Sequence, residues 1–367
     1  MFPQNLTLDQ TLKAIEGHKE FFVSDNEEYI SIDYHYVEQD SFDNPIRKEC
    51  RGIKFKPNGE LLARPYHKFF NYGEKPESTK VDWGKPHQVF DKLDGSMVHG
   101  ALLDGKVVLM TRKGRTDVAI QAEQYLTSNI RSFIAGYIRL GLTPIFEYIG
   151  PDNRIVLFYP QPKLILTALR WNKGGEYAPL SGQYIWPGVT PVCQLDLPVM
   201  NFLHEFIRTQ KGTEGVVVRW QDGTMLKIKT DEYVGLHRAK EAISDERKVV
   251  AVCLQGTVDD LIPLLSQNEA DYVKSIQSNV NKLIGEQVDL LMHFAKFKQW
   301  AAGWDSTRKD YALEVYKKGA LPANLRPAAF KLYDNSNLLP IELVKESLLS
   351  LTTNNNKFKE LKEMLNG

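Results

Sequence analysis

Several common sequence signals are missing from this chain of 367 residues. Its three cysteines, Cys50, Cys193 and Cys253, share no metal-ligand spacing, and an odd number argues against a disulfide framework and for a reducing compartment. No run of about 20 apolar residues occurs, and Met1–Leu12 lacks the apolar run of a signal peptide. The sequence therefore predicts a soluble protein that is not exported.

Other absences limit how the chain could bind a nucleotide or a nucleic acid. The eight histidines form no ligand-spaced cluster, and no glycine-rich segment fits the Walker pattern, so neither a zinc site nor a P-loop is expected. The 46 basic and 46 acidic residues cancel, so global steering of a polyanion is weak. A polyanion must use a local groove, with affinity falling as salt rises. Candidates for this groove are Arg112, Lys113, Arg115, Lys227 and Lys229.

What the chain does contain is the segment Lys92-Leu93-Asp94-Gly95-Ser96. Taken alone, it is typical of a surface turn with Asp-Gly at its tip. It also fits the Lys-x-Asp-Gly pattern in which a lysine amine carries a nucleoside monophosphate. A lysine with the ordinary pKa of about 10.4 is almost fully protonated near neutral pH, so this role requires burial or neighbouring cations.

Charged residues further along the chain lie in or beside predicted strands. Glu147 stands in an apolar run, Glu214 opens another, and Lys227 and Lys229 alternate with apolar residues. Singly, each would be an exposed strand residue or an ion-pair partner. A period of two, however, places both lysines on one face, where they could bind a triphosphate and lower the pKa of a nearby lysine. The carboxylates could bind a ribose hydroxyl or a divalent ion.

With these residues the chain resembles the covalent nucleotidyltransferase superfamily of ligases and capping enzymes, and most closely the phage RNA ligase 1 family. The resemblance extends from about residue 45 to the end and rests on Glu49–Ile53, Arg64–Asn71, Lys92–Ser96 and Arg308–Ala312. It implies an ATP-dependent RNA ligase that uses Mg²⁺ or Mn²⁺. Such an enzyme joins RNA 5′-phosphate and 3′-hydroxyl ends through lysyl-AMP and adenylylated RNA, here of single-stranded RNA or a broken tRNA loop.

The resemblance also implies roles for individual residues. Lys92 would be the adenylylated nucleophile, and Glu214 would bind the metal. Asp94, Lys227 and Lys229 would also be catalytic; Asp94 would orient the lysine or contact a metal-bound water, although it could also merely shape the turn. Trp171 or a neighbour would stack on the purine. The other implied nucleotide contacts are Arg51, Lys68, Lys227 and Lys229 at the phosphates, Glu147 at the ribose, and Phe70, Gly95 and Lys113 elsewhere in the site.

Partners and location follow from the same resemblance. It implies a monomer from a phage, acting in the cytoplasm of an infected bacterium and paired with a polynucleotide kinase-phosphatase that heals RNA ends. No membrane contact is expected. Two alternatives stay open. One is an mRNA guanylyltransferase or DNA ligase of the same superfamily, and the other is an RNA-binding protein that has lost catalysis.

The expected fold is α+β, with an adenylyltransferase domain over residues 1–238. Antiparallel hairpins are predicted where turns with Asn-Gly or Asp-Gly separate apolar runs, and a helical stretch is predicted over Asp117–Leu140. The predicted strands are Tyr29–Val37, Ile53–Phe55, Leu61–Arg64, Met97–Leu102, Val107–Thr111, Ile145–Ile149, Ile155–Tyr159, Leu164–Trp171, Val216–Trp220 and Met225–Lys229.

Residues 239–367 show helical spacing and predict an all-helical second domain. DNA ligases and capping enzymes generally have a strand-rich barrel there, so its absence favours an RNA ligase whose helical domain helps to select RNA. Asp259 and Asp260 could bind a second ion, although acids in a first helical turn are favoured anyway. The predicted helices are Val249–Cys253, Val258–Leu265, Ala270–Phe297, Ser306–Lys318 and Ile341–Leu349.

Overall fold

A computed structural model gives the fold of the chain. It describes residues 2–197, 202–301, 307–317 and 320–366, with the backbone alone for residues 295–301. The chain divides into two compact units, unit 1 (Met1–Val234) and unit 2 (Gly235–Gly367). The division falls inside helix α6 (Asp231–Ala242), four residues before the predicted boundary after residue 238.

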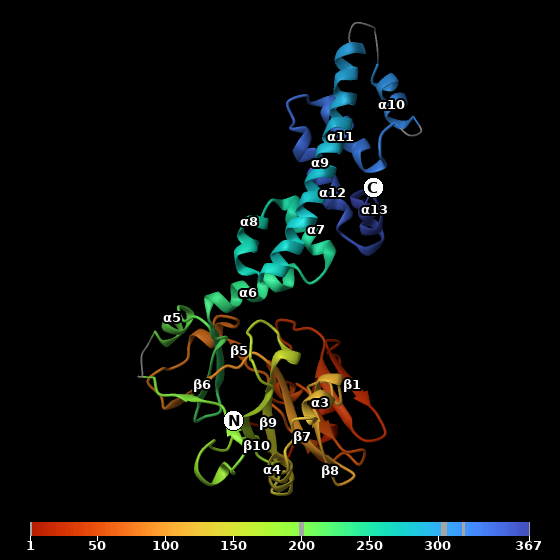
Figure 1. The fold of residues 1–367 in the computed structure, drawn as a ribbon. Helices are drawn as coiled ribbons and strands as arrows, with labels where there is room; N and C mark the ends of the chain where they lie inside the picture. The colour runs from red at the N-terminus through yellow and green to blue at the C-terminus, as the bar shows by residue number, and fades with distance from the viewer. Residues whose placement is uncertain (1, 198–201, 302–306, 318–319, 367) are drawn as a thin grey trace. The chain divides into compact units, whose positions relative to one another are not determined.

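Unit 1 is α+β, as predicted, and contains three mainly antiparallel sheets (Figure 1). The first sheet runs β1 (Phe21–Asp25), β2 (Ile30–Tyr34), β3 (Ile53–Phe55) and β4 (Leu61–Ala63). The second runs β11 (Thr190–Pro191), β10 (Lys163–Trp171), β9 (Leu142–Ile149), β7 (Ser96–Leu103) and β8 (Lys106–Met110). The third runs β12 (Gln194–Leu195), β6 (His87–Asp91), β13 (Gly215–Trp220), β14 (Met225–Lys229) and β5 (Phe70–Asn71). The edge pairs β10 with β11 and β14 with β5 are parallel.

Both predicted hairpins form, but the strand predicted over Ile155–Tyr159 is wrong, because this segment is an irregular loop. The backbone N–H groups of Val156 and Leu157 donate to the Asp94 carboxylate instead of to a neighbouring strand. A side-chain acceptor from a distant part of the chain therefore takes the place of a sheet ladder for these two N–H groups.

The helical stretch over Asp117–Leu140 is two helices, α3 (Asp117–Glu123) and α4 (Ser128–Arg139). Helix α4 begins where the Thr127 side chain accepts a hydrogen bond from the Ile130 backbone N–H, which satisfies one donor of the first turn. The other helices of unit 1 are α1 (Leu8–Ile15), α2 (Pro45–Glu49) and α5 (Leu203–Arg208), with 3₁₀ turns at Pro76–Thr79, Pro151–Asn153 and Gly182–Tyr184.

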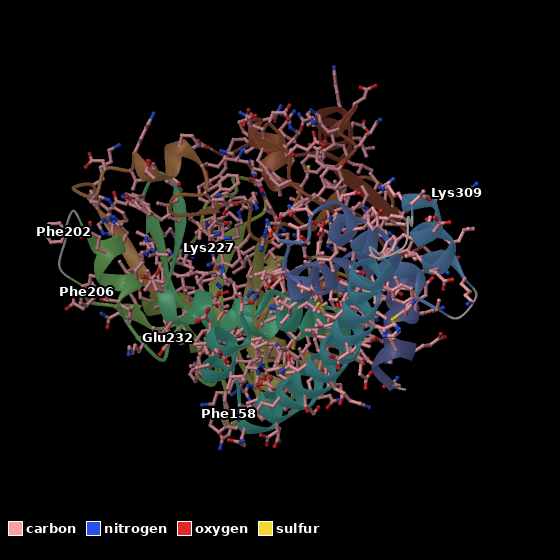
Figure 2. The ribbon with its side chains drawn as sticks, turned by 90° about the horizontal axis from the view of Figure 1, so that it is seen from above. Phe158, Phe202, Phe206, Lys227, Glu232 and Lys309 are labelled. Carbon is pink, nitrogen blue, oxygen red and sulfur yellow. The ribbon has the colours of Figure 1, made fainter. Side chains whose placement is uncertain are left out.

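The second and third sheets each bury one face in a hydrophobic core and leave polar residues on the other. On β9, Phe146 and Tyr148 pack in the core with α4, and Glu147 between them faces away. On β13, Val216 and Val218 pack in the core with α5. The faces opposite these cores are where the polar site residues gather. By contrast, Phe158, Phe202 and Phe206 are exposed at the periphery of unit 1, whereas Lys227 lies inward (Figure 2).

Unit 2 is helical over its described residues, as predicted, and has its own apolar core. The predicted helix over Ala270–Phe297 lies within α9, and that over Ser306–Lys318 overlaps α10, although Ser306 and Lys318 themselves lie outside the described residues. Its helices are α7 (Glu246–Gln255), α8 (Val258–Leu261), α9 (Gln267–Ala301), α10 (Arg308–Tyr316), α11 (Arg326–Asp334), α12 (Pro340–Leu351) and α13 (Asn355–Asn366), with 3₁₀ turns at Ile262–Leu264 and Ala323–Leu325. Among the described helices of either unit, none has the length and apolarity to span a bilayer.

Candidate active site

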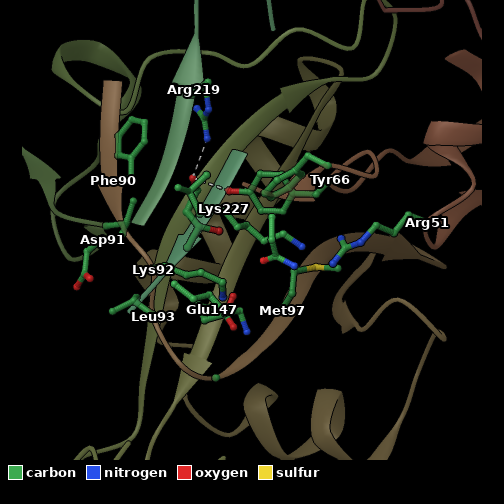
Figure 3. Close-up of a pocket in the computed structure, with 17 residues that line it drawn as sticks. Arg51, Tyr66, Phe90, Asp91, Lys92, Leu93, Met97, Glu147, Arg219 and Lys227 are labelled. Atoms are coloured by element: carbon green, nitrogen blue, oxygen red, sulfur yellow. Dashed lines mark hydrogen bonds between the residues drawn. The ribbon is translucent and has the colours of Figure 1, made fainter. Parts of the chain in front are cut away.

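A pocket of about 330 Å³ lies between the second and third sheets of unit 1 (Figure 3). This volume falls in the range of small-molecule sites. Lys92, just after β6, reaches the pocket together with Glu147 of β9 and Lys227 and Lys229 of β14. Arg51 and Gly95 also line it. Six of the residues singled out from the sequence are therefore brought together, from segments far apart in the chain.

Lys92 is held at the pocket by its backbone and its side chain. Its backbone N–H donates to the Gly215 carbonyl at 2.9 Å, which fixes the lysine beside the start of β13. Its Nζ lies 2.8 Å from Glu214 Oε2, and Lys229 Nζ lies 3.0 Å from Oε1 of the same carboxylate. Glu214 is buried, so one carboxylate pairs with two lysines in a site that solvent reaches poorly.

Two glycines of the sequence motifs are required by close backbone approaches. A Cβ at Gly95 would lie 2.3 Å from the Tyr148 carbonyl oxygen on β9. A Cβ at Gly215, whose φ is 142°, would lie 2.0 Å from the Ile228 carbonyl oxygen. Such contacts are far too short for any larger residue. The glycines let the Lys92 turn and the Glu214 turn sit directly against neighbouring strands.

Asp94 shapes the loop beside the Lys92 turn. Its Oδ2 accepts hydrogen bonds from the Val156 and Leu157 backbone N–H groups at 2.8 and 2.6 Å, and its Oδ1 accepts one from the Tyr233 hydroxyl at 2.6 Å. The side chain is almost fully buried and lies outside the pocket lining. Of the three roles that the sequence left open for Asp94, these contacts favour shaping of the turn.

Two ionisable groups in the pocket are placed to titrate near neutral pH. Burial lowers the pKa of Lys227 to about 7, and the positive charges of Arg51, Lys68 and Lys92 act in the same direction, against the weaker effect of Glu74. Burial raises the pKa of Glu147 to about 7, which Lys92 opposes. The negative charges of Glu214 and Asp94 assist that rise, and Arg51 opposes it.

Binding of a polyphosphate should therefore be coupled to proton uptake. The ligand's negative charge favours a protonated Lys227 and a neutral Glu147, so it raises both pKa values above about 7. Affinity should be highest below pH 7 and should fall as pH rises from 7 toward the pKa values of the complex. Calorimetry with ATP and no divalent ion, in buffers of different ionisation enthalpy, should show uptake of roughly 0.5–1 proton at pH 8.

Variants separate the two contributions. Lys227→Met should remove most of the uptake and Glu147→Gln the remainder, while Lys106→Met, an exposed change at the start of β8, should leave it unaltered. Binding by the parent protein without any proton uptake would contradict the pKa values on which this expectation rests.

The aromatic residues that line the pocket are not those that the sequence predicted. Phe70 packs in the core of the first sheet, with Lys68 Nζ 5.0 Å from its ring centroid. Its neighbour Phe69 lines the pocket instead, and Lys227 Nζ lies 5.2 Å from the Phe69 ring centroid. Trp171, at the end of β10, is 37% exposed and lies outside the pocket lining, as does Lys68.

The local basic groove expected from five residues is only partly assembled. Lys227 and Lys229 line the pocket, whereas Lys113 is exposed outside it. Arg112 and Arg115 also lie outside the pocket lining, and each is paired with an acid: Arg112 Nε is 3.0 Å from Asp33, and Arg115 Nη2 is 3.3 Å from Glu123.

Arg51 strengthens the phosphate-binding character of the pocket. Its Nη1 is buried and finds no hydrogen-bond acceptor among the described residues. A buried N–H without a partner is uncommon in native proteins and indicates a missing ligand or water. Arg51 thus has a donor available where Lys92, Lys227 and Lys229 gather.

A divalent ion could be held here only with the help of its ligand. Among the described residues, no group of three or more His, Cys, Asp or Glu side chains is placed to hold a metal ion. Mg²⁺, however, commonly binds through one or two carboxylates together with substrate phosphates, and Glu214 fits that pattern. Asp259 and Asp260 lie exposed in unit 2, and the part of the chain that is described gives them no such cluster either.

The lining residues that sequence reasoning did not single out include Tyr66, Phe69, Thr167 and Arg219. Arg219 carried a signal, because it follows Val217 at a period of two on a predicted strand. Thr167 carried the same kind of signal, because Leu164 and Leu166 pack in the core and the next residue of the strand faces the other side. The β-bulge between Leu166 and Ala168 shifts the alternation only for the residues that follow it.

The Lys92 turn, two lysines on one strand, the buried Glu214 and the pocket-lining Glu147 around a ligand-sized pocket define a site suited to phosphoryl chemistry. Comparison with known proteins is consistent with that class. The family model described as RNA ligase matches residues 49–233, which include every residue of the pocket, and the chain belongs to this family of ligases. The resemblance stated from the motifs is thus confirmed.

Individual relatives are similar over most of their length. A protein of Thermovibrio ammonificans provisionally named an RNA ligase is 30% identical over 316 residues, which is 80% of this chain and 82% of that protein. RNA ligase 1 of bacteriophage TS2126 is 28% identical over 310 residues, 77% of this chain and 75% of the phage protein. A solved archaeal ATP-dependent RNA ligase is 14% identical, with a TM-score of 0.47, over 94% of this chain and 79% of the archaeal chain.

Proposed function

We propose that this ligase consumes ATP to join RNA 5′-phosphate and 3′-hydroxyl ends through a covalent AMP on Lys92. The observation that carries the proposal is the position of Lys92 Nζ, in a pocket whose other cationic groups are Arg51, Lys227 and Lys229. Four positive groups suit a triphosphate rather than a monoanion. Glu147 on the facing sheet is available for the ribose hydroxyls.

In the first step, the free amine of Lys92 forms a bond to the α-phosphorus of ATP, and the bond from that phosphorus to the pyrophosphate oxygen breaks. Pyrophosphate leaves with the bonding electrons, and Arg51, Lys227 and Lys229 stabilise its charge. The amine releases one proton, for which Glu214, 2.8 Å away, is the nearest carboxylate acceptor. A divalent ion bound by Glu214 and the phosphates would neutralise further charge.

The next two steps transfer the activation to RNA. An oxygen of the RNA 5′-phosphate forms a bond to the AMP phosphorus, the nitrogen–phosphorus bond breaks, and the Lys92 nitrogen takes up one proton to leave as the free amine. A 3′-hydroxyl oxygen then attacks the 5′-phosphate, AMP leaves, and the hydroxyl proton is released. Lys227 and Lys229 lie where they could stabilise the AMP phosphate in both steps.

A denaturing gel after incubation with α-labelled ATP and Mg²⁺ tests the proposal directly. We expect covalent label on the parent protein and its transfer to single-stranded RNA that bears a 5′-phosphate. Preference for GTP would favour an mRNA guanylyltransferase, and preference for nicked DNA would favour a DNA ligase. No label with either nucleotide would favour an RNA-binding protein without catalysis.

Further parts of the proposal concern the RNA and its setting. We place single-stranded or broken tRNA ends as substrates of a monomeric enzyme in the cytoplasm of a phage-infected bacterium. A polynucleotide kinase-phosphatase would prepare such ends, because the ligase needs a 5′-phosphate and a 3′-hydroxyl. Comparing sealing of a cleaved tRNA anticodon loop with sealing of an unstructured RNA tests the substrate.

Unit 2 is proposed to select RNA, which predicts a division of labour between the units. A chain ending at Ala242 keeps unit 1 and all of α6, including Tyr233, whose hydroxyl binds Asp94. It should retain most label transfer from ATP and lose far more of its RNA sealing. Circular dichroism melting would establish that the shortened chain is folded, and equal loss of both activities in a folded chain would contradict the division.

A further inference from the structure

One end of the pocket holds a buried arginine that the protein leaves partly unpaired. Arg219 lies four residues beyond Gly215 on β13, and Gly215 is the residue whose carbonyl accepts the Lys92 backbone N–H. At about 3.3 Å per strand residue, Arg219 is roughly 13 Å along the strand from that point. Figure 3 shows Arg219 and Phe90 at one end of the pocket, away from Lys92 and Glu147.

The contacts of Arg219 fix its head and leave the buried Nε–H without an acceptor. The residue is only 8% exposed, and its guanidinium carbon lies 4.9 Å from the Phe90 ring centroid and 4.6 Å from that of Tyr177. Its Nη2 donates to the Thr167 carbonyl at 3.4 Å. Its buried Nε has no hydrogen-bond partner within the described part of the chain. A donor buried in this way indicates a missing acceptor.

The acceptor for Nη2 is produced by an irregularity in β10. Leu166 pairs with Phe146 and Ala168 with Ile145, so Thr167 is left without a partner in the ladder. Its carbonyl is instead free to accept from both the Tyr66 hydroxyl, at 2.9 Å, and Arg219. A bulge next to a site commonly redirects a group toward it. Here it holds the arginine head against the pocket wall.

We infer that Arg219 recognises the nucleobase, with its Nε–H donating to a ring nitrogen of the purine; this inference rests on the proposed function. If the α-phosphorus meets Lys92, the base extends away from the lysines toward the end of the pocket that Arg219 closes. Arginine has donors and no acceptor, so the base must present an acceptor there. Adenine offers ring nitrogens N1, N3 and N7 as acceptors.

ATP analogues that lack one ring nitrogen test the inference without any change to the protein. The parent enzyme would be assayed by ATP–pyrophosphate exchange with ATP and with 1-deaza-, 3-deaza- and 7-deaza-ATP. One analogue should raise KM about tenfold with little change in kcat, because it leaves the buried donor unpaired. Unchanged KM with all three analogues would overturn the inference.

Variants then assign the effect to Arg219. Arg219→Met should raise KM for ATP by a similar factor and lose its discrimination against that one analogue. Arg219→Lys keeps a cation between Phe90 and Tyr177 but has no Nε–H, so it should also lose discrimination, and it decides the matter if the methionine variant does not fold. The exposed Arg139→Met at the end of α4 is the matched control and should behave as the parent does.

The remaining outcomes are distinct. If Arg219→Lys discriminated against the analogue as strongly as the parent does, the base contact would belong to another group and the inference would be wrong. If the parent enzyme showed no exchange with ATP at all, the proposed function itself would fail. If Arg219→Met raised KM by the same factor for ATP and for every analogue, its discrimination among them would equal that of the parent. Arg219 would then have a structural role only, and the inference would be wrong.

Discussion

Lys92→Arg should abolish transfer of label from α-labelled ATP to the protein, lowering it by roughly a thousandfold or more. Arginine keeps the positive charge and can still pair with Glu214, so the cation cluster should survive. Its guanidinium is protonated at any accessible pH and cannot act as a free amine nucleophile. The measurement is covalent label on a denaturing gel, read together with ATP–pyrophosphate exchange.

The control for this variant is Lys106→Arg, which makes the same chemical change at an exposed position outside the pocket. It should label as the parent does. RNA that is already adenylylated at its 5′ end bypasses the lysine, so Lys92→Arg should still seal such RNA at a measurable rate. Persistent label on the arginine variant would remove Lys92 from its proposed role.

The ion pairs of the pocket differ from the arrangement of lysines that the sequence predicted. Repulsion among lysines was expected to act on the nucleophile. In the structure, Glu214 is interposed between Lys92 and Lys229, and among the lysines that line the pocket it is Lys227 whose pKa falls to about 7. Phosphate groups that draw Lys229 away from Glu214 would change the environment of Lys92 on substrate binding.

The residues that sequence reasoning brought together correctly share one property, a simple strand period. Lys227 and Lys229 both line the pocket because alternate residues of β14 face the same side. Glu147 does so because its neighbours Phe146 and Tyr148 must be buried in the core. Where burial of one face determines the register, charges on the other face are predictable.

The misplaced residues lie where no regular period applies. Phe69 and Phe70 are adjacent in an extended segment, and which of them enters the pocket depends on packing against Lys68, Tyr34 and Phe42 rather than on any local pattern. Trp171 stands at a strand end, where core and solvent are equally accessible. The Asp94 loop and the β-bulge beside Thr167 depend on hydrogen bonds between residues far apart in the chain, which composition and periodicity do not encode.

A buried ion-pair cluster beside the pocket should carry a large share of the stability of unit 1. Glu49, Arg64 and Arg170 are each at most 2% exposed. Arg64 Nη2 lies 2.8 Å from Glu49 Oε1, and Arg170 Nη1 lies 2.8 Å from Oε2. Burial alone would raise the pKa of Glu49, but Arg170 and Arg64 hold it at about 2. The cluster joins the end of α2, two residues before Arg51, to β10.

Glu49→Gln should therefore destabilise the protein by about 3–5 kcal/mol, because it leaves two buried guanidinium groups without a carboxylate. This is a large part of the 5–15 kcal/mol that is typical of whole domains. Urea unfolding at pH 7, followed by tryptophan fluorescence, would measure it. The control is Glu60→Gln, which makes the same change in the exposed ion pair with Lys56. This variant should unfold at the same urea concentration as the parent. A glutamine variant at position 49 as stable as the parent would contradict the argument.

The same cluster predicts that the stabilising contribution of Glu49 is lost at acid pH. The pKa of Glu49 is about 2 in the folded protein against the ordinary value of 4.5 that applies to the unfolded chain, so folded Glu49 binds its proton less readily than unfolded Glu49. Its stabilising contribution is complete above pH 4.5 and is lost as pH falls from 4.5 toward 2. The difference in stability between the parent and Glu49→Gln should therefore shrink across that interval. Because an amide does not titrate there, a constant difference would show that the carboxylate charge is not what holds Arg64 and Arg170.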